Sequence, residues 1–141
     1  MKSAARIIAL GLVVLPLLAA AQMRQDEKIT VNVPFEFVVD GKTVPAGEWA
    51  VRSASDGAWL VSLSNREVKV GVFTTTTIYE TQKPASRYAL VFHKYGDEHY
   101  LAGIKVGGST IWYHLPQSKA EAELRAKNVP AGEEVVLAQL N

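Results

Sequence analysis

A run of strictly alternating apolar residues near the start of the chain is the feature that most restricts its fold. Every second position over 29–37 is apolar, namely Ile29, Val31, Val33, Phe35 and Phe37. A period of two places successive side chains on opposite faces of a β-strand, so one face of this strand is predicted to be buried. Pro34 cannot donate a ladder hydrogen bond, and we therefore expect the strand to lie at a sheet edge or to have the Pro34 nitrogen facing outward.

The following strands form a predicted meander with one apolar face. The turn residues 44–47 precede a strand at 49–53, and a loop at 55–57 with a left-handed Gly57 sets the next register. This register pairs Trp49 with Leu63, Val51 with Val61 and Ser53 with Trp59. A four-residue loop at 64–67 then aligns Val68, Val70 and Val72 with Leu63, Val61 and Trp59. The residues expected to be buried together are Trp49, Val51, Val61, Leu63, Val68 and Val70.

A second hairpin and a helix follow. Gly96-Asp97 joins strands at 88–95 and 99–106, with predicted pairs Lys94–His99, Phe92–Leu101 and Leu90–Gly103. After a strand at 110–115, Ser118 and Glu121 have the spacing of a capping box that opens a helix to about Lys127. A last strand is expected at 135–140. The chain is thus predicted to be all-β, an antiparallel β-sandwich or partly closed barrel of about eight strands, with one short C-terminal helix before the last strand.

The first 21 residues have the layout of a secretory signal peptide. Lys2 and Arg6 precede an apolar run from Ile7 to Leu18, and three alanines at 19–21 provide the cleavage site. We expect cleavage after Ala21, a disordered N-terminus at 22–28 and a single β-rich domain at 29–141. The product is predicted to be periplasmic or secreted, without stable membrane insertion after cleavage.

Composition excludes several classes of function. The chain has 15 Lys and Arg against 14 Asp and Glu, a balance that does not indicate a nucleic-acid partner. It has no cysteine, so thiolate catalysis, disulfides and cysteine-ligated zinc are excluded. Nucleotide-binding and EF-hand motifs are also missing from the sequence. We expect no cofactor.

Three blocks of sequence resemble a known family. They are Val33-Pro34-Phe35-Glu36-Phe37 with Gly41-Lys42 and Pro45-Ala46-Gly47, then residues 90–97 (LVFHKYGD), then residues 115–121 (LPQSKAE). Together with the signal peptide, they resemble a family of small secreted bacterial proteins, numerous in acidobacterial genomes and without an assigned activity. The resemblance covers most of the mature chain. It implies an exported protein and indicates no substrate or catalytic residue.

The residues that could carry catalysis are not arranged for it in the predicted register. His93 and His99 point to opposite faces of their hairpin, so they cannot share a metal ion unless the loop has three residues, and His114 lies on a further strand. Gly107-Gly108-Ser109 lacks the motif of a nucleophile elbow. The carboxylates that could pair for glycoside hydrolysis are interpreted as solvated charges: Asp97, Glu98, Glu121, Glu123, Glu133 and Glu134. No catalytic residue and no metal ligand is predicted, and the protein is not expected to be an enzyme.

Aromatic residues suggest a binding surface instead. Trp112 shares a strand face with His114, while Tyr95 and Tyr100 share a face with His93, so the outer side of the second hairpin is the candidate ligand-binding surface. The alternative is that a second layer or the helix covers these rings as core. The leading hypothesis is a non-enzymatic binding or structural module of the cell envelope or extracellular space, with a protein, peptide or polysaccharide as partner. The alternatives are a carbohydrate-binding module that uses Trp112 and neighbouring tyrosines, and a small hydrolase that uses His93, Asp97 and His114.

Overall fold

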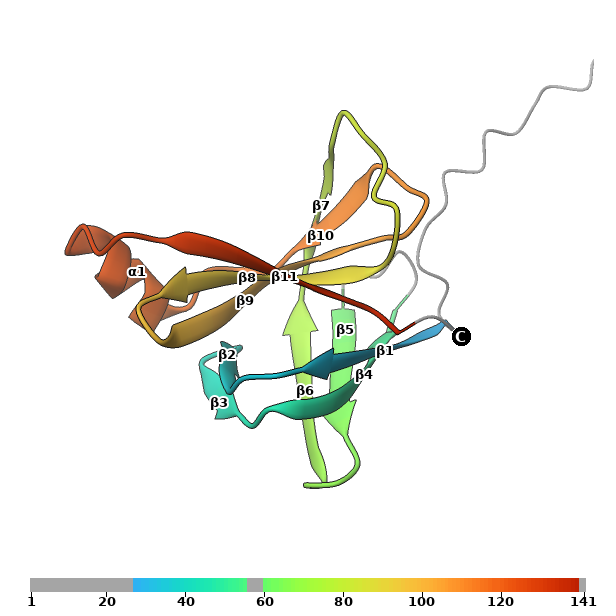
Figure 1. The fold of residues 1–141 in the computed structure, drawn as a ribbon, viewed down its shortest axis with the longest axis horizontal. Helices are drawn as coiled ribbons and strands as arrows, with labels where there is room; N and C mark the ends of the chain where they lie inside the picture. The colour runs from blue at the N-terminus through green and yellow to red at the C-terminus, as the bar shows by residue number, and fades with distance from the viewer. Residues whose placement is uncertain (1–26, 56–59, 140–141) are drawn as a thin grey trace, which may run out of the picture.

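The computed structural model describes residues 27–55 and 60–139, which form eleven β-strands and one helix (Figure 1). The elements in chain order are β1 Lys28–Val33, β2 Phe37–Val39, β3 Lys42–Val44, β4 Gly47–Ser53, β5 Leu60–Asn65, β6 Val70–Thr75, β7 Thr77–Glu80, β8 Ala89–Tyr95, β9 Glu98–Lys105, β10 Ile111–His114, α1 Lys119–Ala126 and β11 Gly132–Leu137. The helix lies at one end of the molecule, before the last strand, as predicted.

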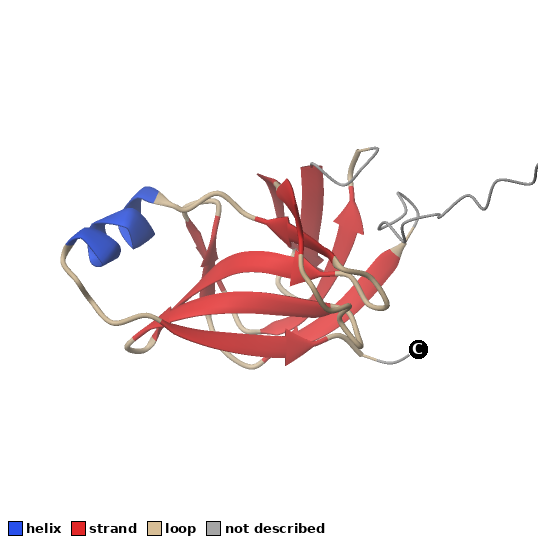
Figure 2. Ribbon diagram, turned by 90° about the horizontal axis from the view of Figure 1, so that it is seen from above, coloured by secondary structure: helices blue, strands red, loops and turns tan. Residues whose placement is uncertain are grey.

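Two sheets make up the fold. Sheet A has the strand order β1-β4-β5-β6, and sheet B has the order β11-β8-β9-β10-β7. The neighbours within both orders are antiparallel, while the small β2–β3 hairpin joins sheet B through a parallel pairing of β2 with β9. The sheets do not close into a barrel (Figure 2). The prediction of an all-β sandwich-like fold is therefore confirmed.

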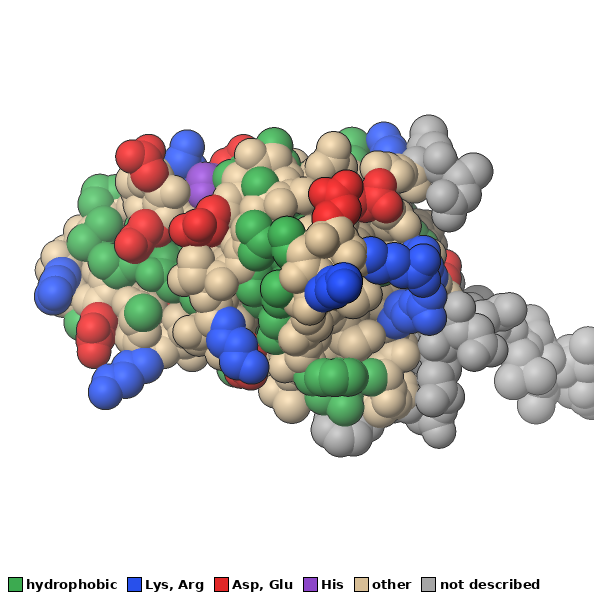
Figure 3. Space-filling model, turned by 90° about the horizontal axis from the view of Figure 1, so that it is seen from below, with side chains coloured by type: hydrophobic (Ala, Val, Ile, Leu, Met, Phe, Trp, Pro, Cys, Tyr) green, Lys and Arg blue, Asp and Glu red, His purple; other side chains and the backbone are tan. Residues whose placement is uncertain are grey.

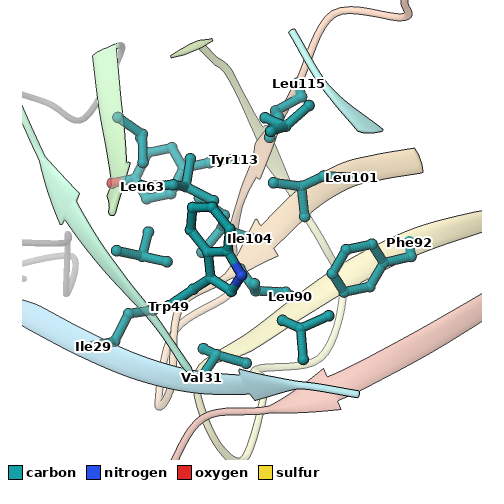
Figure 4. Close-up of a cluster of buried hydrophobic side chains, with 14 of the residues drawn as sticks. Ile29, Val31, Trp49, Leu63, Leu90, Phe92, Leu101, Ile104, Tyr113 and Leu115 are labelled. Carbon is teal, nitrogen blue, oxygen red and sulfur yellow. The ribbon is translucent and has the colours of Figure 1, made fainter. Parts of the chain in front are cut away.

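The core fills the space between the inner faces of the two sheets. Trp49 of β4 lies among side chains from both sheets, including Leu63, Leu90 and Tyr113 (Figure 4). The indole is fully buried, and its Nε1 donates a hydrogen bond to the carbonyl of Pro45 at 3.1 Å. The turn that precedes β4 therefore satisfies the one polar atom of the largest core side chain.

The chain forms eleven strands instead of about eight because two predicted strands are divided and β3 was not predicted. The strand predicted at 29–37 ends at Val33, and β2 starts at Phe37, so Pro34 lies just after the last residue of β1. β1 is an edge strand of sheet A, as expected for this segment. Further along, the chain passes at Thr76 from β6 in sheet A to β7 in sheet B. The Thr-rich segment is thus a corner between the sheets.

The predicted register of β4 and β5 is wrong by two residues. Val51 pairs with Leu63, and Ser53 pairs with Val61, whereas the sequence predicted Trp49 opposite Leu63. The connection is longer than three residues because the Ser55 hydroxyl accepts a hydrogen bond from the Leu60 amide at 3.1 Å. A shift of two keeps the same face buried, so Trp49, Val51, Val61 and Leu63 lie together in the core. Gly57 and Trp59, with the predicted left-handed turn, lie outside the described residues.

The register of β5 and β6 also differs from the prediction. Leu63 pairs with Val72, because the turn lies at 66–69 instead of 64–67. Buried Asn65 fixes this turn, since its Oδ1 accepts hydrogen bonds from the amides of Glu67 and Val68. Val68 consequently lies in the turn with 48% of its surface exposed, and its predicted burial is wrong. Val70 is partly buried against the core.

The second hairpin matches two of its three predicted pairs. Lys94 pairs with His99 and Phe92 with Leu101, but Leu90 pairs with Ile104 because the register shifts between Val91 and Phe92. Such a bulge bends the strand pair and increases its twist. The helix starts as predicted, with the Ser118 hydroxyl accepting from the Glu121 amide at 3.1 Å. β11 begins earlier than predicted, and β1 begins at Lys28, inside the segment expected to be disordered.

Candidate binding surface

One row of side chains crosses the whole outer face of sheet B. The paired positions, from β11 to β7, are Leu137, Ala89, Lys105, Trp112 and Tyr79. Their neighbours Leu90, Ile104 and Tyr113 point the other way and belong to the core. Because side chains alternate along a strand, the row faces away from sheet A. It is the position at which the sequence predicted an outer aromatic surface.

Three rings of this face form a cluster that we call the Trp112 patch: Tyr79, Trp112 and His114. The ring centroids of Trp112 and His114 are 4.7 Å apart, and those of Tyr79 and His114 are 5.2 Å apart. Tyr79 is 56% exposed, while Trp112 and His114 are partly exposed. The predicted face shared by Trp112 and His114 is confirmed, and Tyr79 extends it by one strand.

The Trp112 indole packs closely against the sheet because the residue beneath it on β9, Gly103, has no side chain. A Cβ atom added to Gly103 would meet Trp112 Nε1 at 2.0 Å and Cε2 at 2.9 Å, so the indole lies directly over this glycine. Nε1 is buried there and has no hydrogen-bond partner among the described residues. The indole therefore has a fixed position on the sheet although part of it remains exposed.

A groove of about 330 Å³ lies beside the Trp112 patch. Its lining comes from sheet positions and from the segment that connects β7 to β8, and includes Trp112, Lys105, Val135, Leu137, Lys83 and Arg87. The Lys105 Nζ atom lies 5.3 Å from the centre of the Trp112 ring. Arg87 donates from Nη2 to the carbonyl of Ala138, which fixes its guanidinium at the groove. The groove thus combines an aromatic ring, aliphatic side chains and cations.

The other end of the same face is covered by α1 through a polar group that we call the Glu121 cluster: Glu121, His93, Tyr95 and Arg125. Glu121 is only 4% exposed. Its Oε1 lies 2.5 Å from His93 Nδ1 and accepts from the Tyr95 hydroxyl at 2.9 Å. Arg125 Nε donates to the Tyr95 oxygen at 2.8 Å. Because a carboxylate accepts only, His93 donates from Nδ1.

This cover changes the predicted binding surface. Tyr95 and Tyr100 are buried, with ring centroids 5.6 Å apart, and His93 is largely covered. The three side chains do share one face, as predicted, but they lie under the helix instead of on an exposed platform. Burial raises the pKa of Tyr95, with the hydrogen bond from Arg125 acting in the opposite direction. The hydroxyl therefore stays protonated and able to donate.

His114 lies between the two ends of the face. Its pKa is lowered below the ordinary value, first by burial and then by the neighbouring charge of His93, while Glu121 acts in the opposite direction. The imidazole is consequently neutral at neutral pH. It contributes an uncharged ring to the Trp112 patch.

The histidines have separate partners. His99 Nε2 lies 2.8 Å from Glu134 Oε2, and its ring stacks on Phe35 with 3.7 Å between centroids. His93 instead binds Glu121, so the prediction that these two histidines do not meet is confirmed. The interpretation of Glu121 as a solvated charge is wrong, and that of Glu134 is incomplete. Over residues 27–55 and 60–139, no group of three potential ligands is placed to hold a metal ion.

The serine hydroxyls with assigned partners bond to backbone groups. Ser53 donates to the Ser55 carbonyl, Ser109 accepts from the Ile111 amide, and Ser118 caps the helix. Asp97, part of the hydrolase hypothesis, is exposed in the turn between β8 and β9. The carboxylate beside His93 is Glu121, and it positions a helix. In the part of the chain that the structure describes, no helix is both long and apolar enough to cross a bilayer.

Comparison of the chain with protein-family models, with curated proteins and with solved structures finds no match. The resemblance to small secreted bacterial proteins therefore stays a prediction. Sequence reasoning identified Trp112 and His114 but missed Tyr79, Lys105 and Arg87, which join them in the structure. The segment 77–80 has two adjacent apolar residues, Ile78 and Tyr79, so alternation does not single out Tyr79. Arg87 has no local signal either, because its position depends on the path of the β7–β8 connection.

Proposed function

We propose that this chain is an exported, non-enzymatic binding module of the cell envelope or extracellular space, which recognises its partner with the uncovered part of the outer face of sheet B. The observation that carries the proposal is the position of the Trp112 patch. Its rings lie outside the core between the sheets, and α1 covers only the other end of this face. An aromatic group that the fold does not use internally is available for a partner.

The surroundings of the Trp112 patch support this use. Val135 and Leu137 of β11 are large exposed apolar side chains on the same groove. Apolar side chains gathered at one surface site, with polar groups beside them, are typical of interaction sites. Trp and Tyr are also the residue types that most often dominate binding energy. A partner that covers the groove would bury these side chains together.

The chemistry of the described polar groups favours binding over catalysis. Hydrolysis by a serine requires a hydroxyl hydrogen-bonded to a base, whereas the assigned serine hydroxyls are engaged with the backbone. His93 has an oriented imidazole, but its carboxylate partner fastens a helix. Export is part of the proposal because of the signal peptide predicted at 1–21, which lies outside the described residues.

Retention on envelope material tests the proposal. The mature chain is immobilised and exposed to an envelope extract, with cell-wall and polysaccharide fractions run alongside. Trp112→Ala is expected to reduce retention of the bound component at least about tenfold, because hot-spot aromatic residues contribute 2 kcal/mol or more.

The matched control is Phe73→Ala. Phe73 is 62% exposed on β6 of sheet A, so this variant removes an exposed aromatic ring from the other sheet. Wild-type retention is expected for this control. Equal retention by the Trp112→Ala protein and the wild type would contradict the proposed site.

A further inference from the structure

We propose that the groove beside Trp112 binds a saccharide that carries carboxylate groups, such as a segment of a uronic-acid polysaccharide. The inference rests on the proposed function and names the class of its ligand. It follows from three features of the groove: its positive charge without a described carboxylate partner, the position of Lys105 over a partly exposed indole, and the engagement of the backbone donors that directly follow β11.

The groove is positively charged in a chain that is almost neutral. Lys83, Arg87 and Lys105 all line it, and its lining includes neither aspartate nor glutamate. The salt bridges among the described residues join other groups, so these three cations have no carboxylate within 4.0 Å there. Elsewhere positively and negatively charged side chains are interspersed. On the face shown in Figure 3, neither the basic nor the acidic side chains cover the surface. A local excess of positive charge favours an anionic ligand.

The aromatic ring and a cation occupy adjacent positions. Lys105 and Trp112 are cross-strand partners, and the ammonium lies 5.3 Å from the ring centre. A sugar ring that stacks on the outer side of the indole would bring a carboxylate at its rim next to this ammonium. The indole cannot move toward the sheet because it already lies on Gly103. The surface is therefore preorganised for a ring with an acidic substituent.

Arg87 supplies a second cation with a fixed position. Its Nη2 donates to the Ala138 carbonyl, while its Nε has no hydrogen-bond partner among the described residues. Lys83 extends the positive charge along the β7–β8 connection. Two or three separated cations suit a ligand with repeated carboxylates better than one with a single charge. The groove volume of about 330 Å³ is at the lower end of the range for small-ligand pockets.

An acidic peptide fits this groove less well. Peptides commonly bind sheets by adding a strand to a free edge. β11 is an edge strand of sheet B, and just after its last residue the amide of Ala138 donates to the Tyr88 carbonyl and the amide of Gln139 donates to the Thr30 carbonyl. The chain thus uses these backbone donors itself. The remaining recognition groups are side chains and a ring, which suit a saccharide.

Calorimetric titration of the mature chain tests the inference. The ligands are an oligogalacturonate, a neutral galactose oligomer of the same length and a short oligoglutamate. We expect the oligogalacturonate to bind tightest, and its affinity to fall as salt rises. Lys105→Gln should weaken this binding at least about tenfold, since hydrogen bonds to charged groups contribute about 1.5–3 kcal/mol. Lys42→Gln, which removes an exposed cation from β3, should leave it unchanged.

Equal or tighter binding of the neutral oligomer or of oligoglutamate overturns the inference, as does the absence of uronate binding or wild-type affinity in the Lys105→Gln protein. None of these outcomes touches the proposed function, which fails separately if Trp112→Ala retains envelope material as well as the wild type does.

Discussion

The two ends of the outer face of sheet B differ in how their polar and aromatic groups are used. At one end, α1 lies over Tyr95 and Tyr100, and the Glu121 cluster pairs a buried carboxylate with a histidine, a tyrosine and an arginine. At the other end, Trp112 is partly exposed, its Nε1 has no described partner, and the cations of the groove have no described carboxylate. The first end is completed within the chain, and the second is open to a ligand.

The covered end shows what an occupied surface looks like on this sheet. There Tyr95 and Tyr100 are buried, and the Glu121 carboxylate, the His93 Nδ1 atom, the Tyr95 hydroxyl and the Arg125 Nε atom bond to one another. The open end also has an aromatic ring and cations, but no carboxylate among the described residues pairs with these cations. The difference indicates which groups a ligand would have to supply: an apolar ring face and negatively charged oxygen atoms.

The largest expected effect separates a core tryptophan from a surface one. Trp49→Ala is expected to lower the free energy of unfolding by about 3–5 kcal/mol, because the indole fills the space between the sheets. Trp112→Ala should cost about 1 kcal/mol, since only part of its surface is buried. Urea unfolding of both variants measures the difference. Equal losses would place Trp112 in a second core layer.

The Glu121 cluster gives the next largest effect. Glu121→Ala should lower the free energy of unfolding by about 2–3 kcal/mol, because the buried Tyr95 hydroxyl and His93 Nδ1 lose their acceptor. Glu123→Ala, on the exposed side of the same helix, should change it by less than about 0.5 kcal/mol. Denaturant titration compares the pair. If Glu121→Ala is as mild as its control, the cluster does not fasten the helix.

A smaller loss is expected where the indole lies on β9. Gly103→Ala should cost about 1–3 kcal/mol, because the new methyl group meets Trp112 and the Tyr113 carbonyl at under 3.0 Å. Gly71→Ala provides the control, since the nearest atom to its Cβ is 3.9 Å away. In a Trp112→Ala background the cost of Gly103→Ala should fall, because two of the three close contacts come from the indole. Additive losses would contradict this packing.

The smallest effect concerns protonation of His114. NMR titration should find the pKa of His114 below its ordinary value of about 6.5, chiefly because of burial. His93→Gln should raise this pKa by removing a nearby positive charge, and Glu121→Gln should lower it further by removing a negative one. Since the folded-state pKa is depressed, the contribution of His114 to stability is complete above about pH 6.5 and decreases as the pH falls toward the folded pKa. An unchanged pKa of His114 in both variants would show that neither neighbour acts on it.

The all-β fold could be predicted because most strands carry a period-two pattern and turn residues separate them. The registers could not be predicted where a side chain next to a turn accepts hydrogen bonds from the backbone and so sets the turn length, as Ser55 and Asn65 do. The bulge after Val91 has no local signal either, because it depends on how two strands twist together. The bulge changes which residues are cross-strand partners, but it does not change the amino-acid sequence pattern of either strand, so the sequence does not reveal it.

The candidate site could be predicted only in part. The face shared by Trp112 and His114 follows from alternation within one strand. Burial of Tyr95 and Tyr100 does not, because it depends on a contact with Glu121 some 26 positions away from Tyr95. Within its own segment, Glu121 looks like a capping residue with an i,i+4 partner, and both features are present as well. The sequence gives no sign that the same side chain also holds the helix on the sheet.

The hydrogen bond from the Gln139 amide to the Thr30 carbonyl has a consequence for the timing of folding. It joins the last described residue to β1, so this contact of β1 can form only after residue 139 has been synthesised. Contacts of such large sequence separation form slowly, because the loop between them must be closed first. Such a delay would suit the export proposed for this chain, since a polypeptide that has not yet closed its fold can still be threaded through a translocation channel.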